Sequence, residues 1–276
     1  MDVDVGIVAQ RDNERAQKLA VTLLETLAAD GVAVVVDDAT GNAVGVPAVP
    51  VDTMGAFDLV VSIGGDGTFL FVAREAGDAP ILGVNLGEVG FLNAVPPEDA
   101  LEAVSRSVDR LRGGDDLEGT SVDRLQVRGD GWNLPPALNE IVVHGPRRGH
   151  GGGATVDVRI DGEPYTGSHV DGVLVATPTG STAYNLSEGG PLVHTTVGAI
   201  VVTQMCATES MPPLVVDDES VVTLEITGAD TGWVICDGRN RQRLEPPKTV
   251  TITVADDPVT LAGPRGNFFD ALEKLE

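Results

Sequence analysis

The segment Phe57-Asp58-Leu59-Val60-Val61-Ser62-Ile63-Gly64-Gly65-Asp66-Gly67-Thr68 decides the fold of the first part of this chain. It begins as an apolar run of strand length, and the glycines that follow precede a helix-compatible segment at residues 69–76. Glycines between a strand and a helix let backbone N–H groups approach phosphoryl oxygens closely, and Thr68 is placed to cap the helix. We therefore expect a phosphate site at Gly64, Gly65, Gly67 and Thr68.

Asp66 is the one carboxylate within this loop. A carboxylate beside phosphate is repulsive unless it holds Mg²⁺ or accepts a proton from an attacking hydroxyl group, so the loop indicates phosphoryl transfer with Asp66 as the catalytic residue. The alternative is an ordinary tight turn, because Asp and Gly are common turn residues. A second glycine-containing motif favours the functional interpretation of the loop over an ordinary turn. In this motif, a predicted strand at residues 173–176 leads into Thr177-Pro178-Thr179-Gly180-Ser181-Thr182-Ala183-Tyr184.

Strand and helix patterns alternate through residues 1–112. Near-continuous apolar runs predict parallel strands covered on both faces, at 3–9, 32–36, 59–63 and 81–84. Helical spacing predicts helices at 13–29 and 97–111, and residues 39–53 are interpreted as a connection. This pattern predicts an α/β domain with an open parallel sheet. Ligands bind beyond the carboxyl ends of such strands, where a second loop carries Asn85, Gly87 and Phe91.

Short strands and turns dominate residues 113–263, which predicts a mostly antiparallel β domain. The expected strands are 122–127, 141–144, 155–160, 173–176, 199–203, 221–226, 233–236 and 249–254. The last stretch, 264–276, contains a helical pattern that we expect to pack back on the first domain. A chain of 276 residues is long enough for two such domains, each with its own core.

The charge of the chain excludes several partners. Acidic residues number 42 and basic residues 18, which gives a net charge of −24. A field of this sign repels nucleic acid and anionic membranes. An acidic surface with only three lysines suits a salt-rich cytoplasm, since the Debye length falls to roughly 3 Å at 1 M salt. The composition therefore indicates a halophilic source.

Cysteine and histidine usage indicates neither disulfides nor zinc. Cys206 and Cys236 lie in apolar segments, so we expect two buried thiols and a reducing compartment. The four histidines have no metal-type spacing, and no side-chain metal cluster is predicted. No apolar run approaches about 18 residues, so the sequence predicts a cytoplasmic protein with no membrane partner.

Three motifs, and the order in which they follow each other along the chain, give the sequence its family resemblance. They are the Gly64–Thr68 loop, the pair Asn139-Glu140, and the long run that begins at Asp171 and ends in Tyr184-Asn185-Leu186-Ser187-Glu188-Gly189-Gly190-Pro191. With them, most of the chain resembles the NAD kinase family, here in a form typical of a halophilic archaeon. The glycine loop alone is also found in lipid kinases, whereas the long motif resembles NAD kinases only.

The resemblance implies Mg²⁺-dependent transfer of the terminal phosphoryl group of ATP, or of polyphosphate, to the 2′-hydroxyl of the adenosine ribose of NAD. Asp66 would accept the proton from that hydroxyl. Residues 1–112 would form the phosphate-donor domain and residues 113–263 the NAD-binding domain, in a homodimer or homotetramer. The residues implied to contact NAD are Asn139, Glu140, Asp171, Thr179, Thr182, Ala183, Tyr184 and Ser187.

Several of these residues could instead have a purely structural role. Asn139 and Glu140 would also suit a polar strand edge, Tyr184 a core position, and Asp171 a turn. Arg147 and Arg148 are candidate phosphate contacts in an acidic protein, or simply exposed turn residues. Two other functions remain open: a sensor that binds NAD or NADP without catalysis, and, less favoured by the charge, a lipid kinase.

Overall fold

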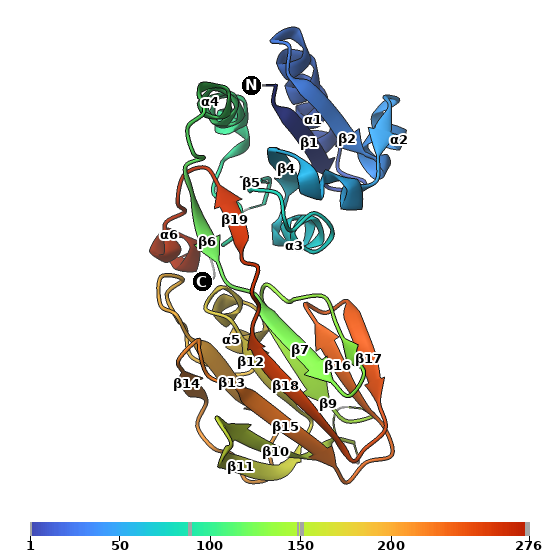
Figure 1. Ribbon diagram of the computed structural model, residues 1–276, viewed down its shortest axis with the longest axis vertical. Helices are drawn as coiled ribbons and strands as arrows, with labels where there is room; N and C mark the ends of the chain where they lie inside the picture. The colour runs from blue at the N-terminus through green and yellow to red at the C-terminus, as the bar shows by residue number, and fades with distance from the viewer. Residues whose placement is uncertain (1, 88–89, 148, 150–151, 274–276) are drawn as a thin grey trace. The chain divides into compact units, whose positions relative to one another are not determined.

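The computed structural model describes residues 2–87, 90–147, 149 and 152–273. Contacts divide the chain into two compact units (Figure 1). The first unit runs to Val122 and resumes at Val259, and the second is Asp123–Pro258. The boundaries predicted from the sequence, after residues 112 and 263, lie about ten residues before the first observed boundary and five residues after the second. The difference arises because two short strands, Gly119–Val122 and Val259–Ala262, lie just before and just after the second unit in the sequence. They pair with each other and so belong to the first unit.

The first unit is built on a mostly parallel sheet in the order β3-β2-β1-β4-β5-β19-β6. Its last two strands pair antiparallel, from segments far apart in the sequence, as Figure 1 shows in green and red. The strands are β1 (Asp4–Ala9), β2 (Ala33–Asp37), β3 (Ala48–Val49), β4 (Leu59–Gly64), β5 (Ile81–Asn85), β6 (Gly119–Val122) and β19 (Val259–Ala262).

Helices connect these strands and cover the sheet. The α-helices of this unit are α1 (Glu14–Ala29), α2 (Asp38–Val44), α3 (Asp66–Glu75), α4 (Ala100–Gly113) and α6 (Phe268–Glu273), with 3-10 helices at Val51–Ala56 and Pro97–Asp99. The core joins both kinds of element: Leu23 and Leu27 of α1 are buried together with Val5 and Ile7 of β1. Because β1, β4 and β5 are parallel, the loops that follow them emerge at one edge of the sheet.

The second unit contains two antiparallel sheets. One has the order β11-β10-β15-β18-β7-β8, and the other β14-β13-β12-β9-β16-β17. The first sheet comprises β7 (Leu125–Gly129), β8 (Trp132–Asn133), β10 (Ala154–Ile160), β11 (Glu163–Val170), β15 (Val222–Thr227) and β18 (Lys248–Val254). The second comprises β9 (Glu140–His144), β12 (Gly172–Ala176), β13 (Ile200–Met205), β14 (Leu214–Val216), β16 (Gly232–Cys236) and β17 (Asn240–Leu244).

One apolar core fills the space between the two sheets. Val156 and Val158 alternate with exposed residues along β10, and they share a buried cluster with Val173 and Val175 of β12. A second cluster lies on the other face of the second sheet, where Leu174 packs with Val201. Strands that are buried on both faces, such as β12, read as continuous apolar runs, which is why the sequence predicts them well.

Four local expectations were wrong. Residues 39–53 are not an irregular connection: they contain α2 and β3, elements too short to show a period. Thr68 is not a helix cap, because α3 begins at Asp66 with Gly65 as its N-cap. The expected strand 122–127 is two strands in different units. The strands that were not predicted from the sequence are short or polar: β8, β11, β14, β17 and β19.

The cysteines differ from each other. Cys236 is buried, as expected, and burial beside Asp237 raises the pKa of its thiol. Cys206 is exposed, contrary to expectation, because it follows the last residue of β13 with a positive φ of 50°. Neither forms a disulfide. Of the helices in the described part of the chain, none has the length and apolar character required to cross a membrane.

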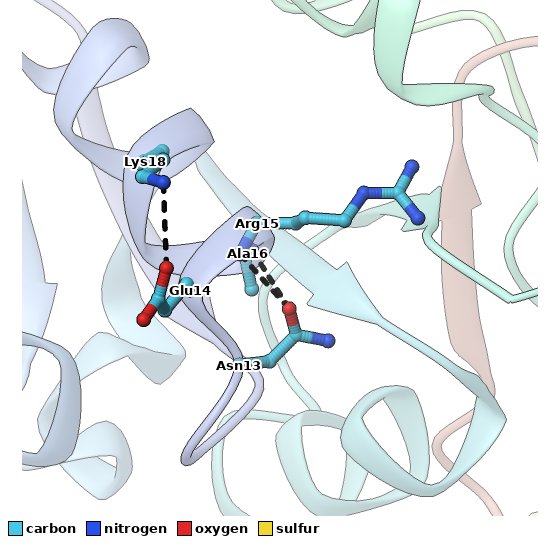
Figure 2. A network of polar contacts seen from close by, with 5 residues as sticks. All are labelled: Asn13, Glu14, Arg15, Ala16 and Lys18. Carbon is cyan, nitrogen blue, oxygen red and sulfur yellow. Dashed lines mark hydrogen bonds and ion pairs between the residues drawn. The ribbon is translucent and has the colours of Figure 1, made fainter.

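The start of α1 shows how local sequence sets an element boundary. Asn13 is the N-cap, and its side-chain Oδ1 accepts hydrogen bonds from the N–H groups of Arg15 at 3.0 Å and Ala16 at 3.2 Å (Figure 2). The Glu14–Lys18 ion pair follows at 3.4 Å with both side chains largely exposed. The cap satisfies two helix N–H groups that would otherwise lack a partner, whereas the exposed pair contributes little.

We expect Asn13→Ala to lower the free energy of unfolding by about 1 kcal/mol, because two N–H groups of α1 lose their acceptor. Denaturant unfolding at fixed high salt measures the change. Glu14→Ala is the matched control, since it removes only an exposed ion pair from the same turn. Equal stability of Asn13→Ala and wild type would contradict the capping role.

Candidate functional site

The first candidate site lies where β4 passes into α3. Gly64 is the last residue of β4, Gly65 is the N-cap of α3, and Asp66 is the first helical residue. No side chain caps this helix. The first N–H groups of a helix have no intrahelical acceptor and carry partial positive charge, so the start of α3 is suited to an anion.

The glycines of this loop serve two purposes. A Cβ at Gly64 would lie 2.5 Å from the Thr68 hydroxyl oxygen, so packing within the loop requires glycine there. A Cβ at Gly65 or Gly67 would meet no atom within 4 Å. These two positions therefore leave open space beside the backbone, which is the property that close approach of a ligand to the N–H groups needs.

Asp66 is held by the loop that follows β5. Its Oδ2 accepts a hydrogen bond from Phe91 N–H at 3.0 Å, and its Oδ1 accepts from Leu92 N–H at 3.3 Å and from Asn93 Nδ2 at 3.0 Å. Three donors fix the direction of the carboxylate. A carboxylate fixed in this way at an uncapped helix start can orient a hydroxyl group and accept its proton.

The loop after β5 is itself tied to β4. Leu86 N–H donates to the Gly64 carbonyl at 3.1 Å, and the Asn85 side chain accepts from Gly87 N–H at 2.9 Å. Asn85 and Gly87 therefore shape the loop, as a turn would, beside the predicted phosphate loop. Phe91 contributes its N–H to Asp66, while its ring packs against Phe268 of α6 with centroids 6.0 Å apart.

Asn93 is a site residue that the sequence analysis missed. It is buried, donates to Asp66, and has no partner for its Oδ1. A Cβ at Gly83 would lie 2.4 Å from that oxygen, so a glycine in β5 makes room for the side chain. The only signal in the sequence was one amide residue between Leu92 and Ala94, at a position that otherwise reads as apolar.

The second candidate site lies in the other unit, where Asn139 directly precedes β9 and Glu140 is its first residue. Both are buried, and Asp237 holds their backbone. The Asp237 carboxylate accepts from the N–H groups of Leu138, Asn139 and Glu140 at 2.7, 2.9 and 3.1 Å, and Asp237 N–H donates to the Glu140 carbonyl at 3.0 Å. Asp237 has a φ of 45°, so the turn after β16 is shaped around these bonds.

The long motif packs directly on this pair. Thr177 N–H donates to the Asn139 carbonyl at 2.9 Å, and the Thr177 hydroxyl donates to the Leu138 carbonyl at 2.6 Å. A Cβ at Gly180 would lie 2.0 Å from the Asn139 carbonyl oxygen, so only glycine permits this approach. A 3-10 helix at Thr179–Thr182 and α5 (Tyr184–Ser187) follow, and carry the predicted residues Thr179, Thr182, Tyr184 and Ser187, with Ala183 between them.

Glu140 carries an unusual charge environment. Burial raises the pKa of its carboxyl from the ordinary value of 4.5 to about 7, and the neighbouring Asp237 charge acts in the same direction, while a hydrogen bond from the Tyr184 backbone opposes them. Its Oε2 is buried and has no hydrogen-bond partner. A buried oxygen without a partner beside a nucleotide-type motif is a position for a ligand hydroxyl or amine group.

Asp171 lies away from this cluster. It precedes Gly172, which pairs with His144, whereas Glu140 pairs with Ala176 at the other end of β12. Five residues of strand span about 17 Å. Asp171 instead accepts from Gly149 N–H at 2.8 Å, in the turn that contains Arg147. Arg147 is exposed, and Arg148 is outside the described residues.

A metal cluster of protein side chains is not part of either site: among the described residues, no group of three or more His, Cys, Asp or Glu side chains is arranged to hold a metal ion.

We expect the stability of the wild type to fall relative to Glu140→Gln as the pH rises from 5 to 8, by up to about 3 kcal/mol. The folded state holds a proton on Glu140 up to about pH 7, whereas the unfolded state releases it near pH 4.5, so ionisation destabilises the fold across this window. Denaturant unfolding at constant high salt measures the difference. Glu225→Gln, at an exposed position of β15, should retain the wild-type pH profile, and identical profiles for Glu140→Gln and wild type would contradict the assignment.

Comparison with solved structures shows that this fold is shared. The crystal structure of a yeast NADH kinase complexed with NADH matches 99% of this chain and 87% of its own, with a TM-score of 0.87 and 24% identity. The structure of an NAD kinase from Archaeoglobus fulgidus in complex with ATP matches 99% of this chain and all of its own, with a TM-score of 0.80 and 24% identity.

Sequence comparison is more specific. NAD kinases of Haloarcula marismortui and Halobacterium salinarum, both halophilic archaea, are 57% and 54% identical to this chain, covering 98% and 99% of it and 99% of each relative. The NAD kinase of Methanopyrus kandleri is 36% identical over 90% of this chain and 88% of its own. Profiles of the ATP-NAD kinase N-terminal and C-terminal domains match residues 5–111 and 138–262. This chain belongs to the NAD kinase family.

Proposed function

We propose that this protein transfers the terminal phosphoryl group of ATP to the 2′-hydroxyl of the adenosine ribose of NAD and so forms NADP. The observation that carries the proposal is the Asp66 carboxylate, held by three donors at the uncapped start of α3. Family membership supports the choice of substrates. Inorganic polyphosphate is an alternative donor, because it presents the same kind of phosphoryl chain to the glycine loop.

Asp66 is the proposed catalytic residue. Its carboxylate accepts the proton of the 2′-hydroxyl as that oxygen forms a bond to the terminal phosphorus, and the bond between this phosphorus and the bridging oxygen of ADP breaks. Phosphoryl transfer depends mainly on positioning and charge stabilisation, so a carboxylate in a fixed direction is the main requirement on the protein. The hydrogen bonds from Phe91, Leu92 and Asn93 supply that direction.

Phosphate binding is assigned to the glycine loop. The first N–H groups of α3 have no side-chain cap, and the open space beside Gly65 and Gly67 lets phosphoryl oxygens approach them. Mg²⁺ enters with ATP as part of the substrate, and it neutralises charge on the phosphates. This fits the residues present, because Mg²⁺ bound to substrate phosphates needs only one or two protein carboxylates, and Asp66 is the carboxylate at this loop.

The second unit is proposed to bind the adenosine part of NAD. The buried Glu140 oxygen without a partner and the adjacent Asn139 amide suit ribose hydroxyls and an adenine edge. Tyr184 is half-buried against the Leu174 cluster and offers part of its ring as an aromatic face. The other proposed contacts are Thr179, Thr182, Ala183 and Ser187. Asp171 and Arg147 lie at the other end of β12, so we assign any contact from them to a different part of the ligand.

The assembly and the location are further proposals. We infer a homodimer or homotetramer, because large apolar side chains are exposed on the second unit, among them Leu192, Val197 and Val215 at 44%, 48% and 44%. Light scattering at high salt measures the mass. Two cysteines without a disulfide fit a reducing, cytoplasmic environment.

We expect Asp66→Ala to lower the rate of NADP formation by about 10² to 10⁴, because the hydroxyl loses its proton acceptor. The assay combines NAD, ATP and Mg²⁺ in high salt, and calorimetry confirms that the variant still binds NAD. Asp78→Ala is the control, since Asp78 is exposed in the same unit. A rate within tenfold of wild type would refute the role of Asp66.

The same assay separates the alternatives. A folded wild type that binds NAD but forms no NADP with either ATP or polyphosphate would be the sensor rather than the kinase. A lipid kinase would phosphorylate a lipid hydroxyl and ignore NAD.

A further inference from the structure

The C-terminal helix lies against the loop that holds Asp66. Phe268, the first residue of α6, packs its ring on the ring of Phe91, with the two centroids 6.0 Å apart and the ring planes tilted by 58°. Phe91 is also the residue whose N–H donates to Asp66 Oδ2 at 3.0 Å. One residue of the loop therefore contacts the carboxylate through its backbone and the C-terminal helix through its side chain.

The inner side of this loop consists of the donors that orient the carboxylate. The N–H groups of Phe91 and Leu92 and the side-chain amide of Asn93 all donate to Asp66, and a Cβ at Gly90 would lie 3.1 Å from Asp66 Oδ1. Hydrogen bonds weaken steeply when their distance or angle departs from the optimum. The direction of the carboxylate therefore depends on how firmly the loop itself is held.

The outer side of the loop is supported by the C-terminal segment. Leu92 and Asn93 are buried, whereas Phe91 is half-buried and Ala94 is exposed. These two outer residues are the ones that meet the end of the chain. The ring of Phe91 contacts α6, and a Cβ at Gly266 would lie 3.5 Å from the Cβ of Ala94, which is an ordinary packing distance.

The C-terminal segment is itself anchored to the sheet of the first unit. It continues from β19, which pairs with β5 on one side and β6 on the other and is drawn in red in Figure 1. Gly263 N–H donates to the Glu118 carbonyl at 2.8 Å, and Arg265 Nε donates to the Thr120 hydroxyl oxygen at 3.3 Å. The support on which the loop rests is thus joined to the central strands.

The start of α6 fixes the place of the Phe268 ring. Asn267 precedes the helix, and its Oδ1 accepts from Phe269 N–H at 3.0 Å while its Nδ2 donates to Asp270 Oδ1 at 2.8 Å. Ala271, one turn further on, is buried. The rings of Phe268 and Phe269 meet edge to face with centroids 5.7 Å apart, and Phe269 is 65% exposed. Of the two rings, that of Phe268 is the one placed against the loop.

We propose that α6 positions the Asp66 carboxylate, and that Phe268 is the positioning residue, which acts through Phe91. The inference rests on the proposed kinase function and deepens it, because it assigns a role in that reaction to the end of the chain. Tilted aromatic pairs are favourable beyond the area that they bury, so the ring contact restrains Phe91. A displacement of about 1 Å in a reacting group can cost about 10²-fold in rate.

Steady-state kinetics of NADP formation in high salt test the proposal. We expect Phe268→Ala to lower kcat at least tenfold and to change the KM values for NAD and ATP less than threefold, because it loosens the proton acceptor and removes no group from either substrate site. Phe268→Tyr keeps the ring and should retain kcat within threefold. Phe269→Ala is the matched control, since it removes the same type of ring from the adjacent, exposed position, and it should also stay within threefold.

A double variant tests whether the effect passes through Asp66. Phe268→Ala combined with Asp66→Ala should be no slower than Asp66→Ala alone, because the residual rate no longer depends on the carboxylate. If Phe268→Ala lowered the rate as much in the Asp66→Ala background as in the wild type, the proposal would be overturned.

Amide hydrogen exchange gives a readout that does not depend on turnover. In Phe268→Ala, the N–H groups of Phe91 and Leu92 should exchange at least tenfold faster than in wild type, whereas those of α1 in the same unit should be unchanged. Unchanged exchange at these two positions overturns the proposal. A uniform increase throughout the first unit also overturns it, because α6 would then only stabilise the fold.

The two measurements separate this inference from the kinase assignment. A wild type that forms NADP keeps that assignment whatever the Phe268 variants do. A wild type that forms no NADP with any donor refutes the assignment, and hydrogen exchange still decides whether α6 holds the loop.

Discussion

The three hydrogen bonds that hold the Asp66 carboxylate are the interaction on which the first site depends. They join the start of α3 to the loop after β5, and a further bond from Leu86 joins that loop to Gly64. Two loops from neighbouring parallel strands are thereby fixed to each other. A carboxylate alone in a glycine loop would be free to turn toward solvent, whereas this one has a single direction.

In the second unit, too, one aspartate carboxylate accepts three hydrogen bonds and fixes a loop. Asp237 accepts three backbone N–H groups from residues 138–140, as Asp66 accepts three donors from residues 91–93. In both units a half-buried aspartate organises a loop that carries polar residues. The consequence differs: Asp66 is itself the proposed reacting group, whereas Asp237 positions the backbone of Asn139 and Glu140. Burial raises the pKa of the Glu140 carboxyl, and the Asp237 charge beside it adds to that effect.

The acidic composition opposes the binding of anionic substrates, and the start of α3 counteracts this repulsion locally. With a net charge of −24, the chain repels the polyanionic substrates that an NAD kinase must bind. Backbone N–H groups at the start of α3 provide positive potential without basic side chains. In concentrated salt the negative field of the chain is screened within a few ångströms, so short-range donors of this kind gain weight relative to the net charge.

The sequence by itself determined the class of both units and the identity of their motifs. Strands β4, β5 and β12 are buried along almost their whole length, so their continuous apolar runs predict them well. The glycine loop by itself is also found in lipid kinases, and the long motif that follows it in the chain makes the resemblance specific. Only the tertiary structure decided which residues meet. Asn93 and Asp237 act on partners 27 and about 97 to 99 positions away, Asp171 is separated from Asn139 by the length of β12, and β19 returns to the first sheet after the whole second unit. Such contacts between distant segments leave no periodic signal, because each involves one polar side chain whose role depends on what the fold brings next to it.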